Sequence, residues 1–516
     1  MRRSILCALA TLALAAPTAA PADAVVHTLS GDVAGASAAQ VESFKGIPFA
    51  APPVGPLRWR PPAPAPRWPG VRAAASFGPS CTQSQRAGRA PLPTSEDCLT
   101  LNVWRPAGTA PGARLPVMVW IYGGAFVMGA SAFPVYDGAH FADDGVILVS
   151  FNYRLGRLGF FAHPALDAGP EPAGNYGLMD QIAALEWVRD NIAAFGGDPA
   201  RVTVFGESAG AVSVNYLMGS PLARGLFARA LAESGFGRSK ALPMTGAGSA
   251  ESVGEAFASA HGIAGDGPAA AAALRALPAQ ALIGDYGGLG SATMPAPMID
   301  GRVVTETIAA AFQKGDEARV PFLEGGNSYE ASLFPNVADA ADAAIARAGP
   351  PAEVEALYGG KPAPEVAREL LTDRLITEPD RCLARLMARQ GLTAYVYEFS
   401  YQPLAMRAES FGAAHGFEVP YVFDNLPQAP VNLGTVKIPA ASADDEAIAR
   451  AVHAYWVAFA KTGDPKSAGG PAWPRFAGGD GAVMSFADDG VSVVRGFEKA
   501  RLDLLERAAE RAGPAP

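Results

Sequence analysis

One serine lies in a glycine-framed motif that is typical of an activated nucleophile. Residues 206–210 read Gly-Glu-Ser-Ala-Gly, and they stand between the β-branched run 201–205 and an apolar helical run. At such a strand–turn–helix corner the hydroxyl of Ser208 projects clear of the backbone at the carboxyl edge of a sheet. The start of the following helix also favours negative charge nearby. The pentapeptide alone is common by chance, but its setting predicts that Ser208 attacks a carbonyl carbon in acyl transfer.

A serine nucleophile needs a base that accepts its proton. In proteins with this turn the acid and the histidine follow the serine along the chain, which leaves His261, His415 and His453. His261 lies in an Ala- and Gly-rich stretch with no strand before it, and His453 opens an amphipathic helical run. His415 lies in the loop Gly-Ala-Ala-His-Gly after a predicted strand, so we assign it as the base. An ordinary histidine pKa would then make activity fall below about pH 6.

The acid that orients the base is expected between these two residues. Residues 325–330 read Gly-Gly-Asn-Ser-Tyr-Glu and follow a predicted strand that ends near residue 323. Glu330 is the acid on that loop, and its carboxylate would orient His415 and stabilise the imidazolium formed during attack. Two alternatives are Glu324, which we place at the strand end, and Asp373, which we interpret as a helix-surface or salt-bridge residue.

Acyl transfer also requires donors for the oxyanion. A second glycine-rich loop, Tyr-Gly-Gly-Ala-Phe at 122–126, leaves another predicted strand. Its small residues allow backbone N–H groups to approach a substrate oxygen closely. We predict a three-donor hole from the N–H groups of Gly124, Ala125 and Ala209, and losing one such donor typically costs on the order of 3 kcal/mol of transition-state stabilisation.

The elements that must position these residues alternate between strand and helix. Short apolar runs without polar alternation predict strands buried on both faces, at 117–122, 146–151, 201–205, 319–323 and 394–399. Helical periodicity recurs at 177–195 and 453–460. The stretch 243–290 has no clear strand, and we interpret it as inserted helices over the active site. The alternation predicts an α/β fold with a central, mostly parallel sheet flanked by helices.

The first 24 residues have the pattern of a signal peptide. Arg2 and Arg3 precede the apolar run 5–16, and small residues lead to Ala-Asp-Ala at 22–24, a typical cleavage site. The run is too short to span a bilayer, and no other stretch has transmembrane length. We therefore expect cleavage after residue 24, a single domain over 25–516, and a secreted or periplasmic protein.

The composition excludes several other functions. A net charge of −9 offers no basic stripe for nucleic acid, and no cysteine or histidine cluster has the spacing of metal ligands. The mature chain keeps three cysteines, enough for one disulfide and one thiol. Cys81 and Cys98 enclose a short Pro- and Gly-containing loop that can close easily, and Cys382 lies in a helix-like stretch, where we expect a buried thiol.

Together these elements resemble the type-B carboxylesterase family, which includes cholinesterases and bacterial para-nitrobenzyl esterases. The resembling segments run along nearly the whole mature chain, at 44–50, 95–103, 152–156, 174–177, 205–210, 326–330 and 415–420. The resemblance implies the α/β-hydrolase fold, hydrolysis of small-molecule esters through an acyl-enzyme intermediate, and no cofactor. It also implies a triad, an oxyanion hole and a disulfide, formed respectively by Ser208, Glu330 and His415, by Gly124, Ala125 and Ala209, and by Cys81 and Cys98.

Two departures from the family pattern concern the oxyanion loop and the expected substrate. Ala125 replaces the third glycine of the oxyanion loop, as in bacterial members, and it retains its N–H group. The loop between Cys81 and Cys98 contains no tryptophan, so the aromatic face that binds quaternary ammonium in cholinesterases is missing there. The alternatives left open are a non-catalytic adhesion module and an enzyme acting on thioesters, lactones, carbamates or amides. We expect a monomer or a weak oligomer.

Overall fold

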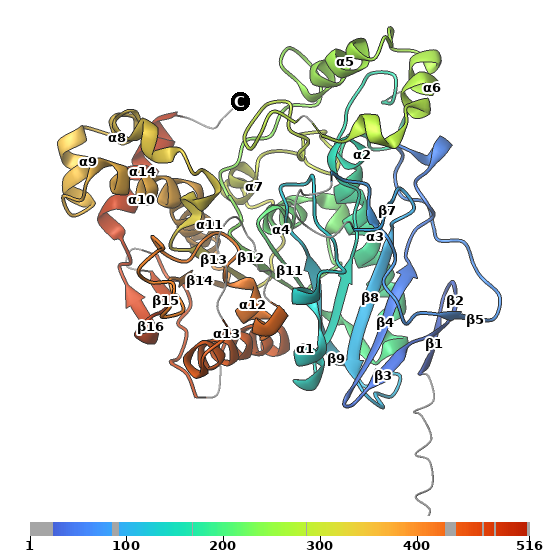
Figure 1. Ribbon diagram of the computed structural model, residues 1–516, viewed down its shortest axis with the longest axis horizontal. Coiled ribbons are helices and arrows are strands. Elements are labelled where there is room, and N and C mark those ends of the chain that lie inside the picture. Colours follow the sequence, from blue (N-terminus) through green and yellow to red (C-terminus); the bar gives the residue numbers. More distant parts are fainter. Residues whose placement is uncertain are drawn as a thin grey trace, which may run out of the picture.

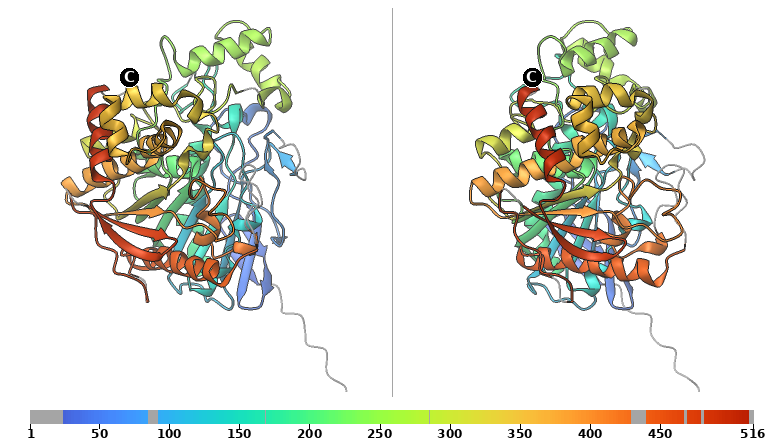
Figure 2. Two further views of the ribbon diagram at one scale, coloured as in Figure 1. Left: turned by 60° about the vertical axis from the view of Figure 1, so that its left-hand side comes forward. Right: turned by 90° about the vertical axis from the view of Figure 1, so that its left-hand side faces the viewer.

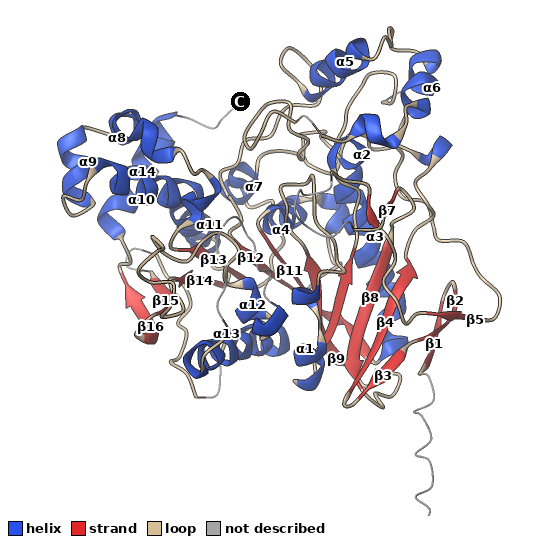
Figure 3. Cartoon of the chain, viewed as in Figure 1, coloured by secondary structure: helices blue, strands red, loops and turns tan. Residues whose placement is uncertain are grey.

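The computed structural model describes residues 24–84, 92–167, 169–284, 286–428, 440–466, 469–478 and 481–512. Its framework is one large sheet, which crosses the molecule in Figures 1 and 3. The strand order is β16-β15-β14-β13-β12-β11-β9-β10-β8-β4-β3. All neighbours from β10 to β15 run parallel, and the outer pairs are antiparallel. The predicted α/β architecture with a mostly parallel sheet is therefore confirmed.

The central strands form where the sequence is continuously apolar. They are β9 (Leu115–Ile121), β10 (Ile147–Phe151), β11 (Gly197–Glu207), β12 (Arg229–Glu233), β13 (Phe322–Asn327), β14 (Ala394–Phe399) and β15 (Ala482–Ala487). The outer strands are β3 (Ala36–Ala38), β4 (Val41–Pro48), β8 (Thr100–Pro106) and β16 (Gly490–Arg495). Residues of β10 are all buried, as expected for a strand covered by helices on both faces.

One predicted strand was misplaced along the chain. We expected a strand at 319–323, but β13 begins at Phe322 and continues to Asn327. Pro321 cannot donate a ladder hydrogen bond, and the two glycines at 325 and 326 lie inside the strand. A Cβ on Gly325 would meet the carbonyl oxygen of Tyr397 at 2.3 Å. The glycines therefore allow close packing within the strand and do not mark a loop.

Helices cover the sheet, and others project beyond one of its edges. The principal ones near the sheet are α1 (Ala139–Asp143), α3 (Tyr176–Asn191), α4 (Ala209–Gly219), α7 (Ile308–Lys314), α11 (Glu378–Arg389) and α13 (Ala443–Thr462). Because α13 begins at Ala443, His453 lies in the middle of this helix and does not open it. The predicted inserted helices are α5 (Ala250–Ala260) and α6 (Pro268–Ala276), and they project above the sheet in Figure 1.

A second group of helices lies on the other side of the molecule from α5 and α6 in Figure 1. These helices are α8 (Ala341–Ala348), α9 (Pro351–Leu357), α10 (Ala363–Thr372) and the C-terminal α14 (Lys499–Ala512). They enclose their own small apolar cluster, which includes Ile345, Val354 and Leu504. In both views of Figure 2 the red α14 lies against the gold helices. This packing brings the end of the chain next to segments more than a hundred residues earlier.

The structure contains the disulfide that the sequence predicted. Cys81 and Cys98 are bonded, with their Cα atoms 5.0 Å apart, and Cys382 is a buried free thiol. Within the described part of the chain, no helix is both long enough and apolar enough to cross a bilayer. The predicted signal peptide lies outside the described residues except for Ala24, and its cleavage remains a prediction.

Candidate active site

Ser208 lies at the sharp corner between β11 and α4. Its backbone angles are φ 56° and ψ −123°, a strained conformation for a residue with a side chain. Its N–H donates to the carbonyl of Glu233 at 2.9 Å. Both flanking glycines are required by sterics, because a Cβ on Gly206 or Gly210 would lie 2.5 or 1.9 Å from the carbonyl oxygen of Ile121. The corner therefore has the form that the motif predicted.

Glu330 and His415 form a buried hydrogen-bonded pair. The Nδ1 atom of His415 lies 2.5 Å from Oε2 of Glu330, and the glutamate is fully buried. The other carboxylate oxygen, Oε1, accepts hydrogen bonds from the Ser234 hydroxyl at 2.5 Å and the Asn327 N–H at 2.8 Å. Because both oxygens have donors, the carboxylate is fixed in an orientation that presents Oε2 to the imidazole.

The two loops that carry this pair are tied to each other. The Asn327 side chain donates to the carbonyl of Ala414 at 2.9 Å, and the N–H of His415 donates to the Ser332 hydroxyl at 2.9 Å. Asn327 ends β13, and the histidine loop follows β14, the neighbouring parallel strand. Parallel strands deliver their carboxyl ends to one edge, which is why residues 85 positions apart meet here.

The second nitrogen of His415 faces the serine corner. Nε2 is buried, has no hydrogen-bond partner among the described residues, and lies 3.1 Å from Oε1 of Glu207, the residue before Ser208. Burial alone would lower the pKa of His415, but the carboxylates of Glu330 and Glu207 outweigh it and raise this pKa to about 9. Burial also raises the pKa of Glu207 to about 7. The expectation that activity falls near pH 6 assumed an ordinary histidine pKa, and the raised pKa moves this expectation to higher pH.

The predicted oxyanion loop passes directly beside the serine. A Cβ on Gly123 would lie 2.9 Å from Cβ of Ser208. Gly124 and Ala125 have φ values of 114° and 56°, and their N–H groups donate no hydrogen bond within the described residues. The N–H of Ala209 belongs to the first residue of α4, so it has no acceptor inside the helix. All three donors are therefore available to a ligand.

The alternative acids and bases lie away from this corner. Glu324 lies inside β13, and neither of its carboxylate oxygens has a described partner. Burial and the neighbouring Asp380 hold its pKa well above the usual range. Asp373 accepts from a buried tyrosine hydroxyl, His261 contacts a carbonyl of its own helix, and His453 contacts a carbonyl of α12 (Val419–Val422). None of these groups contacts Ser208.

Three buried side chains of the site were not predicted. Glu207 lies within the serine motif, where its role as a neighbour of the imidazole was not considered. Ser234 follows β12, a strand that the sequence analysis did not identify. Glu418 accepts a short hydrogen bond from the Asn327 side chain, and burial raises its pKa to about 8. Its position three residues after His415 was the available signal.

Two cavities lie near this region. The larger, of about 2040 Å³, is bordered by α5, α8 and the loop segments 236–242 and 290–298. It reaches the site through Phe236, whose ring centroid lies 5.9 Å from that of His415. It also includes Phe160, whose ring packs 4.9 Å from Phe126 of the oxyanion loop. Its described lining contains no residue of the predicted triad or oxyanion loop, so the cavity borders the candidate site through Phe236 and Phe160.

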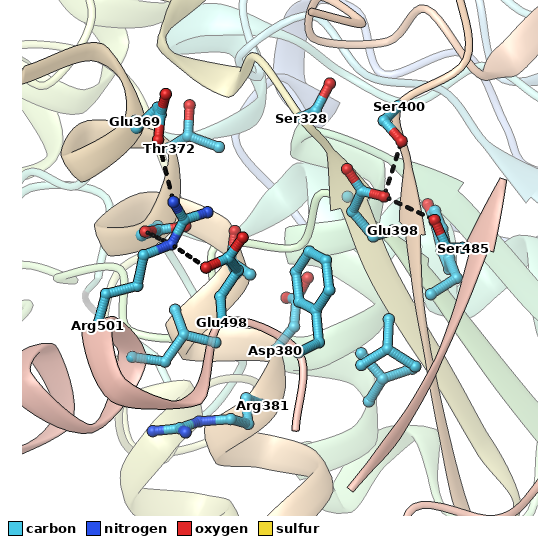
Figure 4. Close-up of a pocket in the computed structure, with 18 of the residues that line it drawn as sticks. Ser328, Glu369, Thr372, Asp380, Arg381, Glu398, Ser400, Ser485, Glu498 and Arg501 are labelled. Carbon is cyan, nitrogen blue, oxygen red and sulfur yellow. Dashed lines mark hydrogen bonds and ion pairs between the residues drawn. The ribbon is translucent and has the colours of Figure 1, made fainter. Parts of the chain in front are cut away.

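The smaller cavity, of about 380 Å³, is shown in Figure 4. Several of its charged side chains pair with one another: Arg501 lies 3.0 Å from both Glu369 and Asp373. Glu398 accepts from the hydroxyls of Ser400 and Ser485 at 2.9 and 3.2 Å. The lining contains no residue of the predicted triad. Among the described residues, no group of three or more potential ligands could hold a metal ion.

Comparison with known proteins places this geometry in context. The chain matches the carboxylesterase family over residues 22–348 and 361–505. It is 39% identical to a fumonisin B1 esterase of Sphingopyxis macrogoltabida, over 92% of this chain and 89% of the relative. It is 34% identical to a phenmedipham hydrolase of Pseudarthrobacter oxydans, over 91% of this chain and 96% of the relative.

Solved structures of esterases are also similar to this chain over most of its length. A PNB esterase superposes with a TM-score of 0.80 at 32% identity, covering 93% of this chain and 99% of that one. A carboxylesterase of Geobacillus stearothermophilus superposes with a TM-score of 0.78 at 35% identity, with the same coverage. The similarity thus extends over nearly the whole described fold.

Proposed function

The chain belongs to the carboxylesterase family, and from that premise we propose that Ser208, His415 and Glu330 are the catalytic triad of a carboxylic ester hydrolase. The observation that carries this proposal is the buried 2.5 Å contact between His415 Nδ1 and Glu330 Oε2, with Nε2 facing the serine corner. An imidazole held in this way keeps its proton on Nδ1 and leaves Nε2 to accept the proton of the nucleophile.

The reaction proceeds in two acyl transfers. Ser208 attacks the ester carbonyl while His415 accepts its proton, and the oxyanion is stabilised by N–H groups of Gly124, Ala125 and Ala209. The protonated imidazole then gives its proton to the departing alkoxide, which leaves as the alcohol. Water, deprotonated by His415, attacks the acyl-enzyme, and collapse of the second intermediate releases the acid and restores the serine.

The substrate is a small-molecule ester. Two relatives are named for different compounds, fumonisin B1 and phenmedipham, so relatives of this chain differ in substrate and do not identify its own. The signal-peptide pattern and the disulfide support export to the periplasm or the medium. N-terminal sequencing of the expressed protein would test whether residues 1–24 are removed. Gel filtration would test the expected monomer or weak oligomer.

The decisive experiment is hydrolysis of a para-nitrophenyl ester series, from acetate to decanoate, by the purified protein and its Ser208→Ala variant. We expect turnover by the parent and a loss of at least about 10⁴-fold in kcat in the variant. Ser259→Ala, an exposed serine on α5, serves as the matched control and should retain full activity. Equal activity of Ser208→Ala and the parent would refute the assignment of the nucleophile.

A further inference from the structure

The cleft that borders the candidate active site through Phe236 is unusually large. Its volume of about 2040 Å³ is more than twice that of a typical small-molecule pocket, which spans about 300–1,000 Å³. Much of its wall is apolar, including Phe161, Leu242, Phe257, Leu371 and Leu375. The cleft therefore accommodates substrates with a long apolar part beyond the scissile ester.

The charged residues of this cleft are mostly basic. Among the described residues, the basic side chains of the lining are Arg157, Arg238, Lys240, Arg347 and Arg374, and the acidic ones are Glu378 and Glu510. This excess of positive charge contrasts with the whole chain, which has 41 basic and 50 acidic residues. A concave wall of one sign focuses its field into the cavity.

One of these basic groups, Arg238, pairs with an acid of the lining. Arg238 makes two hydrogen bonds to the Glu378 carboxylate, at 2.8 and 2.7 Å. Lys240, Arg347 and Arg374 are exposed, and none of them forms an ion pair with a described carboxylate. Lys240 follows two residues after Arg238 on the loop that carries Phe236, the aromatic neighbour of His415.

We propose that this cleft selects esters that carry a second, ionised acidic group, such as a carboxylate, separated from the scissile bond by an apolar chain. The inference rests on the proposed function, because it concerns the substrate of that same site. The ester carbonyl is placed at Ser208, the apolar chain lies along the aromatic and leucine wall, and the anionic group reaches Lys240, Arg347 or Arg374. No side chain in this set takes part in bond making.

The test compares esters that differ only in charge. The first series consists of mono-4-nitrophenyl esters of linear dicarboxylic acids, each matched to the 4-nitrophenyl alkanoate of equal length. The second series consists of octanoate esters of ω-hydroxy acids and their neutral alkyl counterparts, followed by pH-stat. The measured quantity is the ratio of kcat/KM for the anionic ester to that for its neutral match, each corrected for its rate of alkaline hydrolysis.

We expect this ratio to exceed about five at low salt in at least one of the two series. It should fall toward one in 0.5 M NaCl, because salt screens exposed charges. Lys240→Gln and Arg374→Gln should each lower the ratio by about twofold to fivefold. Arg389→Gln, an exposed arginine of α11 outside the cleft, should leave the ratio as it is in the parent.

The two proposals fail in different ways. A ratio near one in both series, with neutral esters still hydrolysed, would overturn the preference for anionic esters and leave the esterase proposal intact. An unchanged ratio in the Lys240→Gln/Arg374→Gln double variant would equally overturn it. Absence of turnover for every ester by the folded parent would instead refute the proposed function.

Discussion

Replacing Glu330 by glutamine provides a sharp test of the proposed triad, because the new amide can be satisfied in only one orientation. In the parent, Oε1 accepts from the Ser234 hydroxyl and the Asn327 N–H, and Oε2 faces Nδ1 of His415. The Asn327 N–H is a fixed donor, so the glutamine oxygen must take the Oε1 position. Placing the amide NH₂ there would leave two buried donors facing each other, at a cost of about 1–3 kcal/mol.

The preferred orientation has a defined consequence for catalysis. With its oxygen at the Oε1 position, the amide of the variant presents NH₂ to Nδ1 of His415. The imidazole then lowers its energy by carrying its proton on Nε2, and in that tautomer it cannot accept the proton of Ser208. We expect kcat to fall by about 10³–10⁴-fold, which corresponds to about 4–5.5 kcal/mol of activation free energy.

The assay is steady-state hydrolysis of a short para-nitrophenyl ester at saturating substrate from pH 6 to 10, with thermal unfolding of each variant to verify its fold. Ser234→Ala is the matched control, since it removes one donor to Oε1 but keeps the carboxylate facing His415, and its loss should stay below about tenfold. If Glu330→Gln retained more than a tenth of the parental kcat at every pH, the tautomer argument would be refuted.

Three further predictions address other parts of the site and fold. Replacing Cys81 and Cys98 by alanine should lower the free energy of unfolding by about 3 kcal/mol, measured by denaturant titration, because the bond closes a loop with a sequence separation of 17. Gly210→Ala should abolish activity or folding, since its Cβ would lie 1.9 Å from a carbonyl oxygen of β9, whereas Gly169→Ala, with no atom closer than 4.0 Å, should be silent in both assays. Glu207→Gln should shift the acid limb of kcat/KM to lower pH: only the neutral imidazole accepts the serine proton, and this carboxylate, 3.1 Å away, raises the histidine pKa. An acid limb that stays in place or moves upward would contradict that account.

The sequence predicted the parts of the site that depend on local backbone chemistry. Ser208 required a turn that only its glycine frame permits, and this requirement is visible in five consecutive residues. Glu330 and His415 could be chosen because each lies on a loop after an apolar run, and parallel strands bring such loops to one edge. The disulfide was implied by the family resemblance, and the short loop between Cys81 and Cys98 permits it. These features are determined by neighbours in sequence, so a pattern of a few residues is sufficient.

Other features depend on packing between distant segments and were missed for that reason. The strand β12 is short, and its run Arg-Ala-Leu-Ala-Glu resembles a helix as much as a strand, so Ser234 could not be placed next to Glu330. The position of β13 was displaced because glycines were interpreted as a loop, although they permit close contact with β14. Glu207 was visible in the motif, but its proximity to His415 arises only when two loops meet.

The residues proposed for the reaction and those proposed for substrate choice lie in different parts of the fold. The residues that we propose as nucleophile, base, acid and oxyanion donors all follow adjacent central strands, so the fold positions them once the sheet forms. The basic residues of the cleft come from loops and peripheral helices between residues 157 and 374, which the sheet constrains weakly. The charge of the side chains at such positions can change without disturbing the reaction centre. Relatives that share the family's chemistry can therefore differ in the esters that they accept, and the cleft of this chain is where its own selectivity must be sought.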